Sequence, residues 1–306
     1  MKIAVSGGTG FIGGHLVRYL RERGDEVVVV SRSGGSDSGT PQAGAGAGAL
    51  RVSWAQLERE PQLLKGLDAF VNLAGESINQ RWTTAAKERI LESRLSAAQA
   101  VARLVSRLRD KPAVVVNGSG MSVYGASEQA TFDESSPAQT SDFLGRVVTQ
   151  WERAADAIVG CRVVKLRIGL VLGADGGALP KMVLPYRLFV GGRIGSGRQP
   201  LSWIHIDDMV RLIDYCIRHD AIVGPVNATA PEPVTNDAFG RTLGRVLRRP
   251  HVLPLPAAAL RLLLGEMASL LLDGQRVLPR KLLDAGFVFR FATLEPALRD
   301  VLRERR

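Results

Sequence analysis

The first sixteen residues constrain the fold more than any other part of this 306-residue chain. A short apolar run at residues 2–6 leads directly into a glycine cluster, in which Gly7, Gly10 and Gly13 stand three residues apart. One glycine lets the chain turn sharply, a second lets the backbone approach a ligand, and a third lets a helix pack closely on a strand. The sequence therefore predicts a strand, a tight turn and a helix in direct succession.

The elements expected on either side of this turn make the glycine spacing a specific signal for a nucleotide-binding turn. Gly8, Gly10 and Gly13 also fit G-x-G-x-x-G, but a chain with 33 glycines produces such spacings by chance. Here a helix is expected at residues 12–23 and a second apolar strand at 26–30, which completes a βαβ unit. The amino end of that helix offers backbone amides and a positive dipole end to a pyrophosphate. We therefore expect a dinucleotide at the turn.

The end of the second strand favours NADP(H) over NAD. A carboxylate there would hold the ribose hydroxyls of NAD and repel an added phosphate, but the chain has Ser31 and Arg32 instead. Their hydroxyl and guanidinium groups suit the 2′-phosphate of NADP, so NAD is the alternative. Residues 33–49 are almost wholly Gly, Ala and Ser, which predicts a mobile loop beside the adenosine end of the site.

Strands and helices alternate along the rest of the chain. Further strands are expected at residues 50–54, 68–75, 113–116, 162–167, 203–206 and 226–228, and helices at 56–64, 83–109, 143–159, 180–190 and 207–219. Continuous apolar runs such as 113–116 are typical of parallel strands that are buried on both faces. Beyond residue 235 the chain is expected to be helical, and residues 274–306 to form a cap of helix, strand and helix.

This pattern predicts an α/β fold, a doubly wound parallel sheet of the Rossmann type with a smaller C-terminal α+β substrate lobe. The NADP-binding domain is expected to span residues 1–168 and to be completed by about residues 201–228. The substrate lobe is expected to comprise residues 169–200 and 229–306.

Composition and charge narrow the expected partners. The net charge of +10 comes from basic residues scattered through helices, and the sequence has no recognisable nucleic-acid-binding motif. A small anionic ligand uses the same positive field, so no nucleic-acid partner is expected and binding to DNA or RNA is a third alternative. The most apolar later run, residues 253–272, is interrupted by Pro254, Pro256, Arg261 and Glu266. It predicts a packed helix, and no membrane partner is expected.

The termini and cysteines indicate a cytoplasmic protein. The first strand begins at the second residue, which leaves no room for a targeting segment. Cys161 and Cys216 are the two cysteines and lack the spacing of metal ligands, so they are expected to be reduced core thiols. No metal site is expected, and a homodimer is compatible with this interpretation.

These motifs carry a family resemblance over nearly the whole chain. The chain resembles an atypical extended short-chain dehydrogenase/reductase of the NAD(P)-dependent epimerase/dehydratase superfamily. The resembling segments are Gly7-Gly8-Thr9-Gly10-Phe11-Ile12-Gly13, Asn72-Leu73-Ala74-Gly75, the loop ending in Val123-Tyr124-Gly125, Leu166-Arg167-Ile168-Gly169 and Trp203-Ile204-His205-Ile206-Asp207-Asp208. It is also similar to an epimerase-like subgroup with a C-terminal domain of unknown function, in Arg81-Trp82-Thr83, Glu92-Ser93-Arg94-Leu95, Phe143-Leu144, Trp151-Glu152 and residues 279–287.

The resemblance implies contacts of the cofactor with the turn, the end of the second strand, the end of the 68–75 strand and two arginines. The expected cofactor-binding residues are Gly7, Thr9, Gly10, Phe11, Ile12, Gly13, Ser31, Arg32, Leu73, Ala74, Gly75, Glu76, Arg94 and Arg167. A strand that ends in Ala-Gly at the switch point of such a sheet allows close approach of a flat ligand.

The resemblance fails at the proton-transfer pair. Working members of the superfamily use a Tyr-x-x-x-Lys pair on the helix after the hydroxyl-rich loop, and the lysine lowers the pKa of the tyrosine. Counting from Ser119, these positions hold Phe143 and Val147, and neither side chain can transfer a proton. The sequence therefore predicts cofactor binding with an atypical active site.

Other residues are candidates for the missing roles. Ser119 or Ser122 would orient a substrate oxygen, Tyr124 would donate a proton, and Glu76 or Arg94 would act near the nicotinamide end. Each also has a structural interpretation: the serines satisfy the loop backbone, Tyr124 packs in the core, and Glu76 pairs with an arginine.

Two functions follow from this sequence. One is an NADP-dependent oxidoreductase or nucleotide-sugar-epimerase-like enzyme, acting on a small anionic or nucleotide-linked substrate. The alternative is a non-catalytic NADP(H)-binding sensor or regulatory protein. The glycine-rich loop at residues 191–200 would bring Arg193 and Arg198 over an anionic substrate. His205 alternates with apolar residues and is expected to be a hydrogen-bonded structural histidine.

Overall fold

Seven parallel strands form the central sheet in the computed structural model, which describes residues 1–32, 49–140 and 142–303. The strands are β1 (Lys2–Ser6), β2 (Glu26–Ser31), β3 (Leu50–Ser53), β4 (Ala69–Asn72), β5 (Val114–Gly120), β7 (Arg162–Ile168) and β11 (Gly224–Ala228). Their spatial order is β11-β7-β5-β4-β1-β2-β3. The chain runs outward from β1 to β3, then returns to the other side of β1 at β4. This reversal is the topological switch point of a doubly wound sheet, where ligands bind.

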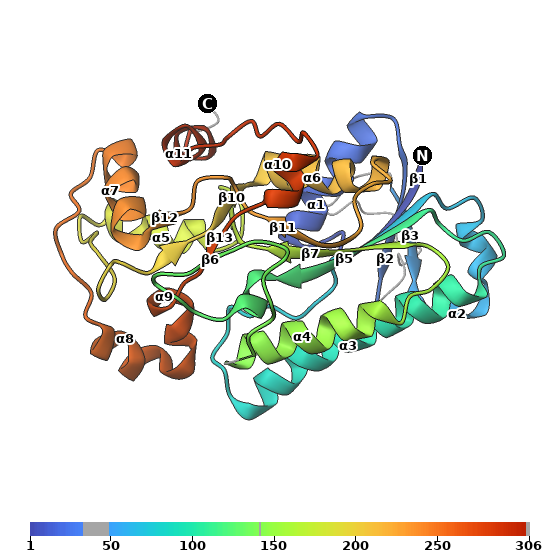
Figure 1. The fold of residues 1–306 in the computed structure, drawn as a ribbon, viewed down its shortest axis with the longest axis horizontal. Coiled ribbons are helices and arrows are strands. Elements are labelled where there is room, and N and C mark those ends of the chain that lie inside the picture. The colour runs from blue at the N-terminus through green and yellow to red at the C-terminus, as the bar shows by residue number, and fades with distance from the viewer. Residues whose placement is uncertain (33–48, 141, 304–306) are drawn as a thin grey trace, which may run out of the picture.

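Helices cover both faces of the sheet, as the alternation of strand side chains requires (Figure 1). The helices are α1 (Phe11–Glu22) and α6 (Ile206–Arg218) on one face, and α2 (Trp54–Arg59), α3 (Thr84–Arg107) and α4 (Phe143–Asp156) on the other. In β1, Ile3 and Val5 pack into the core under α1 and α6, whereas Ala4 packs toward α3. Ile3, Ala4 and Val5 are all fully buried, so the strand is covered on both faces. This arrangement confirms the predicted Rossmann-type α/β fold.

A smaller C-terminal lobe surrounds its own apolar cluster. Its larger helices are α5 (Leu179–Arg187), α7 (Asn236–Leu247), α8 (Ala257–Leu264) and α11 (Leu294–Val301). Its shorter elements are η3 (Gly265–Ala268), α9 (Ser269–Leu272), α10 (Arg280–Asp284), and the strand pairs β8 (Leu170–Leu172) with β10 (Trp203–His205), β9 (Pro200–Leu201) with β12 (Val234–Thr235), and β6 (Thr131–Phe132) with β13 (Arg276–Val277). Trp203, Phe239 and Leu298 lie at the centre of this cluster and are buried.

Several predicted elements differ from those observed. The strand expected at 113–116 continues to Gly120, and the glycines at 118 and 120 let α4 approach β5 closely. The helix expected at 56–64 divides at Pro61 into α2 and a 3-10 turn, η1 (Pro61–Leu64). Beyond residue 274 a short strand comes first and two helices follow, in place of the helix, strand and helix expected. The loop predicted at residues 33–49 lies almost entirely outside the described residues.

Two glycines of the first turn are required by the chain itself. Gly7 has a φ of 76°, and a Cβ atom there would lie 2.6 Å from the backbone carbonyl carbon of Leu73. A Cβ at Gly13 would lie 2.1 Å from the oxygen of Gly7. A Cβ at Gly10, by contrast, would approach only that same oxygen, at 3.3 Å. The turn is therefore tightly packed against β4, and Gly10 faces space.

We expect Gly7→Ala to destabilise the fold far more than Gly24→Ala, a matched control. Both glycines have positive φ, but a Cβ at Gly24 would have no atom within 4 Å. The control therefore carries only backbone strain of about 1–2 kcal/mol, whereas the clash at Gly7 raises the loss to about 3–5 kcal/mol. Urea unfolding of both variants measures the difference, and equal losses would contradict the packing of Gly7 on β4.

Candidate functional site

The amino end of α1 lies at the switch point, and no side chain among the described residues caps it. Gly10 is the N-cap residue, it makes no side-chain cap hydrogen bond, and the first turn holds no acidic residue. The first amides of a helix have no partner within the helix, so they need an acceptor from outside. An anion fits this position because both the amides and the helix dipole favour negative charge.

The predicted cofactor segment after β4 lies directly against this turn. The amide of Leu73 donates to the Ser6 carbonyl at 3.0 Å, which keeps the chain beside β1 as it leaves the sheet. A Cβ at Gly75 would lie 3.2 Å from the guanidinium carbon of Arg94, so the arginine covers this glycine. The structure thus brings together the turn, residues 73–75 and Arg94. Their roles in binding the cofactor remain predictions.

Arg94 is held by carbonyl groups. Its Nη1 donates to the carbonyl of Glu76 at 3.0 Å and to that of Ile90 at 2.8 Å, and its guanidinium lies 5.2 Å from the centre of the Trp151 ring. Burial lowers the pKa of Arg94 to about 10, against the opposing effect of the Glu76 charge. Arg94 still carries its charge at neutral pH, next to the end of β4.

The remaining cofactor candidates lie on either side of the turn. Ser31 ends β2, the strand next to β1, and Arg32 follows it and is exposed. Thr9 is exposed at the tip of the turn. The ring of Phe11 lies against the glycines at 173, 176 and 177, where an added Cβ would come within 2.5–3.0 Å of it. Ile12 is half-buried beside it.

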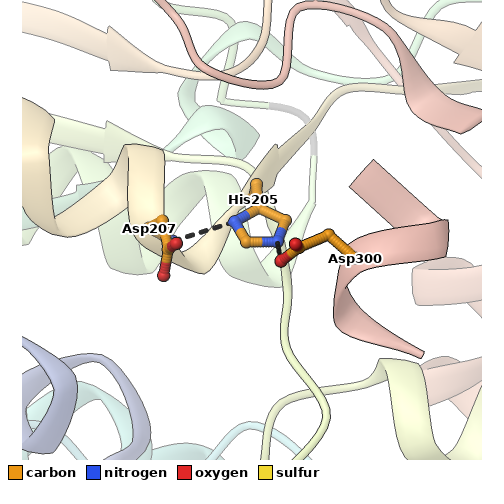
Figure 2. A group of neighbouring side chains, drawn as sticks. All are labelled: His205, Asp207 and Asp300. Carbon is orange, nitrogen blue, oxygen red and sulfur yellow. Dashed lines mark hydrogen bonds and ion pairs between the residues drawn. The ribbon is translucent and has the colours of Figure 1, made fainter. Parts of the chain in front are cut away.

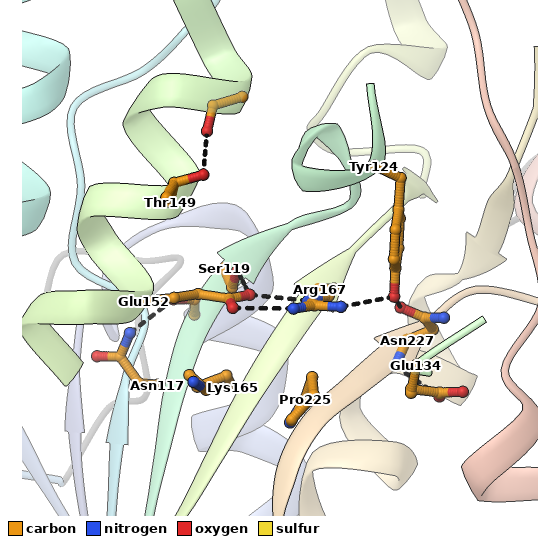
Figure 3. A network of polar contacts seen from close by, with 12 residues as sticks. Asn117, Ser119, Tyr124, Glu134, Thr149, Glu152, Lys165, Arg167, Pro225 and Asn227 are labelled. Atoms are coloured by element: carbon orange, nitrogen blue, oxygen red, sulfur yellow. Dashed lines mark hydrogen bonds and ion pairs between the residues drawn. The ribbon is translucent and has the colours of Figure 1, made fainter. Parts of the chain in front are cut away.

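A buried polar network joins several predicted site residues (Figure 3). Arg167 pairs with both oxygens of Glu152, at 2.8 Å from Nε and 3.0 Å from Nη2. The Ser119 hydroxyl donates to Glu152 at 2.7 Å. On the other side, Arg167 donates to the Tyr124 hydroxyl at 2.8 Å, and that hydroxyl donates to Asn227 at 2.7 Å. The network runs from α4 across β5 and β7 to β11.

The charges of this network stabilise one another. Burial disfavours the Glu152 carboxylate, but the hydrogen bonds and charge of Arg167, with the Ser119 hydrogen bond, outweigh it and lower the pKa of Glu152. Burial raises the pKa of Tyr124, although Arg167 opposes this effect. Tyr124 is fully buried and stacks on Phe132, with ring centres 5.4 Å apart. At neutral pH the network holds one ion pair and a neutral phenol.

The predicted catalytic residues therefore occupy different environments. Ser119 and Tyr124 are buried in the network, and so is Arg167, which was expected to touch the cofactor. Ser122 lies in the 3-10 turn η2 (Met121–Tyr124), is half-buried, and its hydroxyl makes no hydrogen bond within the described residues. Sequence reasoning missed Glu152 and Asn227 as partners. Their signal was weak: Glu152 belonged to a resembling segment, but it lies on helix α4, whereas its partner Arg167 lies on strand β7.

A cleft of about 530 Å³ opens where the tyrosine of the missing pair would stand. Phe143 lines it and packs edge-on against Trp82, with ring centres 5.2 Å apart, whereas Val147 is buried. Arg146 lines the cleft from α4, and Arg261 lines it from α8 of the C-terminal lobe. The cleft thus combines two aromatic rings with two guanidinium groups. Sequence reasoning assigned no role to Trp82, Arg146 or Arg261.

Three acids also line this cleft, namely Asp142, Glu266 and Asp273. Asp142 caps α4 by accepting from the Gly145 amide at 2.6 Å. Burial, with the nearby Asp142 charge, raises the pKa of Asp273, and Arg261 opposes this effect. The cleft therefore presents mixed charge. Of the loop arginines expected to meet a substrate, Arg198 pairs with Glu128 at 3.1 Å and Arg193 is exposed.

His205 is a hydrogen-bonded buried residue, as predicted (Figure 2). Its Nδ1 accepts from the Asp207 amide at 3.0 Å, and its ring stacks on Phe291 at 3.9 Å. The neutral ring therefore carries its proton on Nε2, which lies 3.3 Å from Asp300. Burial lowers the pKa of His205, against the effects of the nearby aspartates. Although His205, Asp207 and Asp300 lie close enough to share a metal, neither ring nitrogen has an available lone pair.

Comparison with known proteins gives matches over the whole length. Residues 3–228 match the NAD dependent epimerase/dehydratase family, and residues 255–301 match a domain of unknown function. Epimerase family protein YfhF of Bacillus subtilis is 41% identical over 309 residues, covering 100% of this chain and 99% of the relative.

Two solved structures are also similar. The human epimerase family protein SDR39U1, solved with NADPH, superposes with a TM-score of 0.89 at 38% identity, covering 98% of this chain and 99% of that one. A nucleoside-diphosphate sugar epimerase from Corynebacterium glutamicum superposes with a TM-score of 0.77 at 30% identity, covering 99% of this chain and 58% of that one.

We expect Glu152→Gln to lower the free energy of unfolding by about 3–5 kcal/mol, because it leaves the buried Arg167 charge without a partner. The folded pKa of Glu152 lies below its ordinary value of 4.5, so its contribution is fully present above pH 4.5 and is lost as the pH falls further. The difference from wild type should therefore shrink in acid.

Glu128→Gln is the matched control, because it removes an exposed pair with Arg198 and should cost less than about 1 kcal/mol. Denaturant unfolding of both variants between neutral and acidic pH measures these effects. Equal losses for the two variants, or a Glu152 effect independent of pH, would contradict the buried ion pair.

Proposed function

Because this chain belongs to the NAD-dependent epimerase/dehydratase family, we propose that it is an NADP(H)-dependent oxidoreductase or epimerase-like enzyme that acts on a small anionic or nucleotide-linked substrate. The observation that carries this proposal is the amino end of α1, which has no side-chain cap and no acidic residue in its first turn. That end lies at the switch point of a doubly wound sheet.

The residues around the turn fit the cofactor. The first amides of α1 would hold the diphosphate, Ser31 and Arg32 would contact the 2′-phosphate, and residues 73–75 would flank the nicotinamide half. The human relative was solved with NADPH, which supports the choice of NADP(H). When bound, the nicotinamide accepts or donates a hydride.

The cleft beside Phe143 is the proposed substrate site. Arg146 and Arg261 supply positive charge for an anionic group, and Trp82 with Phe143 supplies aromatic surface for a sugar or base. A relative named as a nucleoside-diphosphate sugar epimerase supports a nucleotide-linked substrate. Of the predicted catalytic hydroxyls, Ser122 would orient a substrate directly, because it is half-buried and lies outside the buried network. Ser119 and Tyr124 would act from within the buried network.

A non-catalytic NADP(H) sensor is the second candidate. Phe143 and Val147 occupy the proton-transfer positions, and Tyr124 is fully buried. Incubating the protein with NADPH and a panel of carbonyl compounds and nucleotide sugars separates the two functions. Loss of nicotinamide absorbance with formation of product supports an enzyme, whereas saturable binding without turnover supports a sensor.

We also propose that the protein is located in the cytoplasm. Cys161 and Cys216 are both free thiols, as expected in a reducing compartment, and burial raises the pKa of Cys216 to about 12. A thiol with so high a pKa is unreactive at neutral pH. This fits a structural role for Cys216 in the core under α6.

We expect Arg32→Ala to weaken binding of NADPH by about 10- to 100-fold, because it removes a charged hydrogen bond to the 2′-phosphate, and to leave NADH binding nearly unchanged. Fluorescence titration with both nucleotides measures this. Arg59→Ala, which removes an exposed arginine from α2, is the control and should change neither affinity. An equal loss for NADPH and NADH would refute the assignment of Arg32.

A further inference from the structure

One end of the C-terminal lobe exposes a group of apolar side chains. Each is between 50% and 68% exposed; they are Leu184, Leu188, Phe189, Val190, Val252 and Leu253. The amides of Val252 and Leu253 donate to the carbonyl of Gly191 at 2.9 and 3.1 Å, so the segment after α5 and the connector after α7 lie side by side. We call these six residues the lobe-end surface. The connector runs along the end of the molecule between α7 and α8 (Figure 1).

An arginine-lined cavity adjoins the lobe-end surface. It has a volume of about 690 Å³ and is lined by Arg241, Arg245, Arg248 and Arg249. Arg249 connects the two features, because its guanidinium lies 4.4 Å from the centre of the Phe189 ring. Arg241 and Arg245 pair with carboxylates of their own lobe, but within the described ranges no carboxylate pairs with Arg248 or Arg249. Positive charge therefore borders the apolar side chains.

The backbone is strained at two points on this end of the molecule. Phe189 has a φ of 61° and Arg248 a φ of 55°, and in the described part of the chain they are the two non-glycine residues with positive φ. Both follow the end of a helix, where glycine or asparagine normally takes this conformation. A phenylalanine there is unusual, and such strain is typical of functional surfaces. The positive φ at Phe189 and Arg248 lowers the stability of the fold, and at these two positions an aromatic ring and a guanidinium group are exposed.

We propose that the lobe-end surface binds an anionic phospholipid bilayer, with its apolar side chains in the interfacial layer and with Arg248 and Arg249 of the adjoining cavity on headgroup phosphates. A small free anion would leave the apolar group in water. In a symmetric dimer, a second copy of the chain would place its own Arg248 and Arg249 opposite these two arginines, so that like charges would face one another. An anionic bilayer complements both features, and the net charge of +10 adds long-range attraction.

This contact lies on the surface of a membrane. Within residues 1–32, 49–140 and 142–303, no helix combines the length and apolar character that a bilayer crossing demands. The expectation that the protein has no membrane partner rested on the lack of a spanning segment, which a surface contact does not need. The proposal is independent of the cofactor site, because the lobe-end surface shares no residue with the turn or the cleft.

Vesicle flotation tests the proposal. Wild-type protein should float with phosphatidylcholine vesicles that contain phosphatidylglycerol, should float less in high salt, and should not float with phosphatidylcholine alone. Phe189→Gly should weaken the partitioning by about tenfold, and Arg248→Gly by about fivefold. Because glycine relieves the strained backbone at both positions, each variant should also melt at a higher temperature than wild type. A merely structural role would not lower binding while raising stability.

Two controls keep the test specific. Val288→Ser removes a side chain that is 73% exposed elsewhere on the lobe, and Arg153→Glu reverses an exposed charge on α4; both variants should float as wild type does. The proposal fails if Phe189→Gly floats like wild type, or if wild type floats equally with neutral vesicles. It also fails if Phe189→Gly instead abolishes a concentration-dependent dimer, or if Arg248→Gly instead abolishes retention on RNA.

Discussion

The close approach of the first turn to the chain leaving β4 determines where a ligand can bind. Gly7 lies so near Leu73 that only a residue without a side chain fits, and Gly13 packs on Gly7 in the same way. This packing places the uncapped amino end of α1 beside the end of β4, at the switch point of the sheet. Gly10 alone of the three faces space, so it is the glycine that a ligand would require.

The buried pair of Arg167 and Glu152 connects this binding edge to the C-terminal lobe. Through Tyr124 the network reaches Asn227, whose side-chain amide donates to the carbonyl of Leu278 at 2.9 Å. A buried charge is tolerated only when it is paired and hydrogen-bonded, so each member needs the others. Residues that resemble catalytic groups in sequence therefore hold the sheet and the lobe in register.

The local pattern of residues in the sequence predicted the fold well, but it predicted the candidate site only in part. The glycine turn, the apolar strands and the helix that Asp142 caps all depend on residues near one another in sequence, and all are found. The hydroxyl-rich segment after residue 116 was expected to be a loop, whereas β5 continues through it to Gly120 and buries the Ser119 side chain. The pairing of Glu152 with Arg167 and the cleft between α4 and the lobe depend on tertiary packing, which no local pattern encodes.

The most direct test of the account is a titration of Gly10→Val with NADPH. A side chain at this position meets little of the protein, so the variant should fold with a loss of about 1 kcal/mol and should show no measurable affinity for the nucleotide. Fluorescence titration beside a thermal melt measures both properties. Wild-type affinity in a folded Gly10→Val variant would contradict the claim that the amino end of α1 holds a diphosphate.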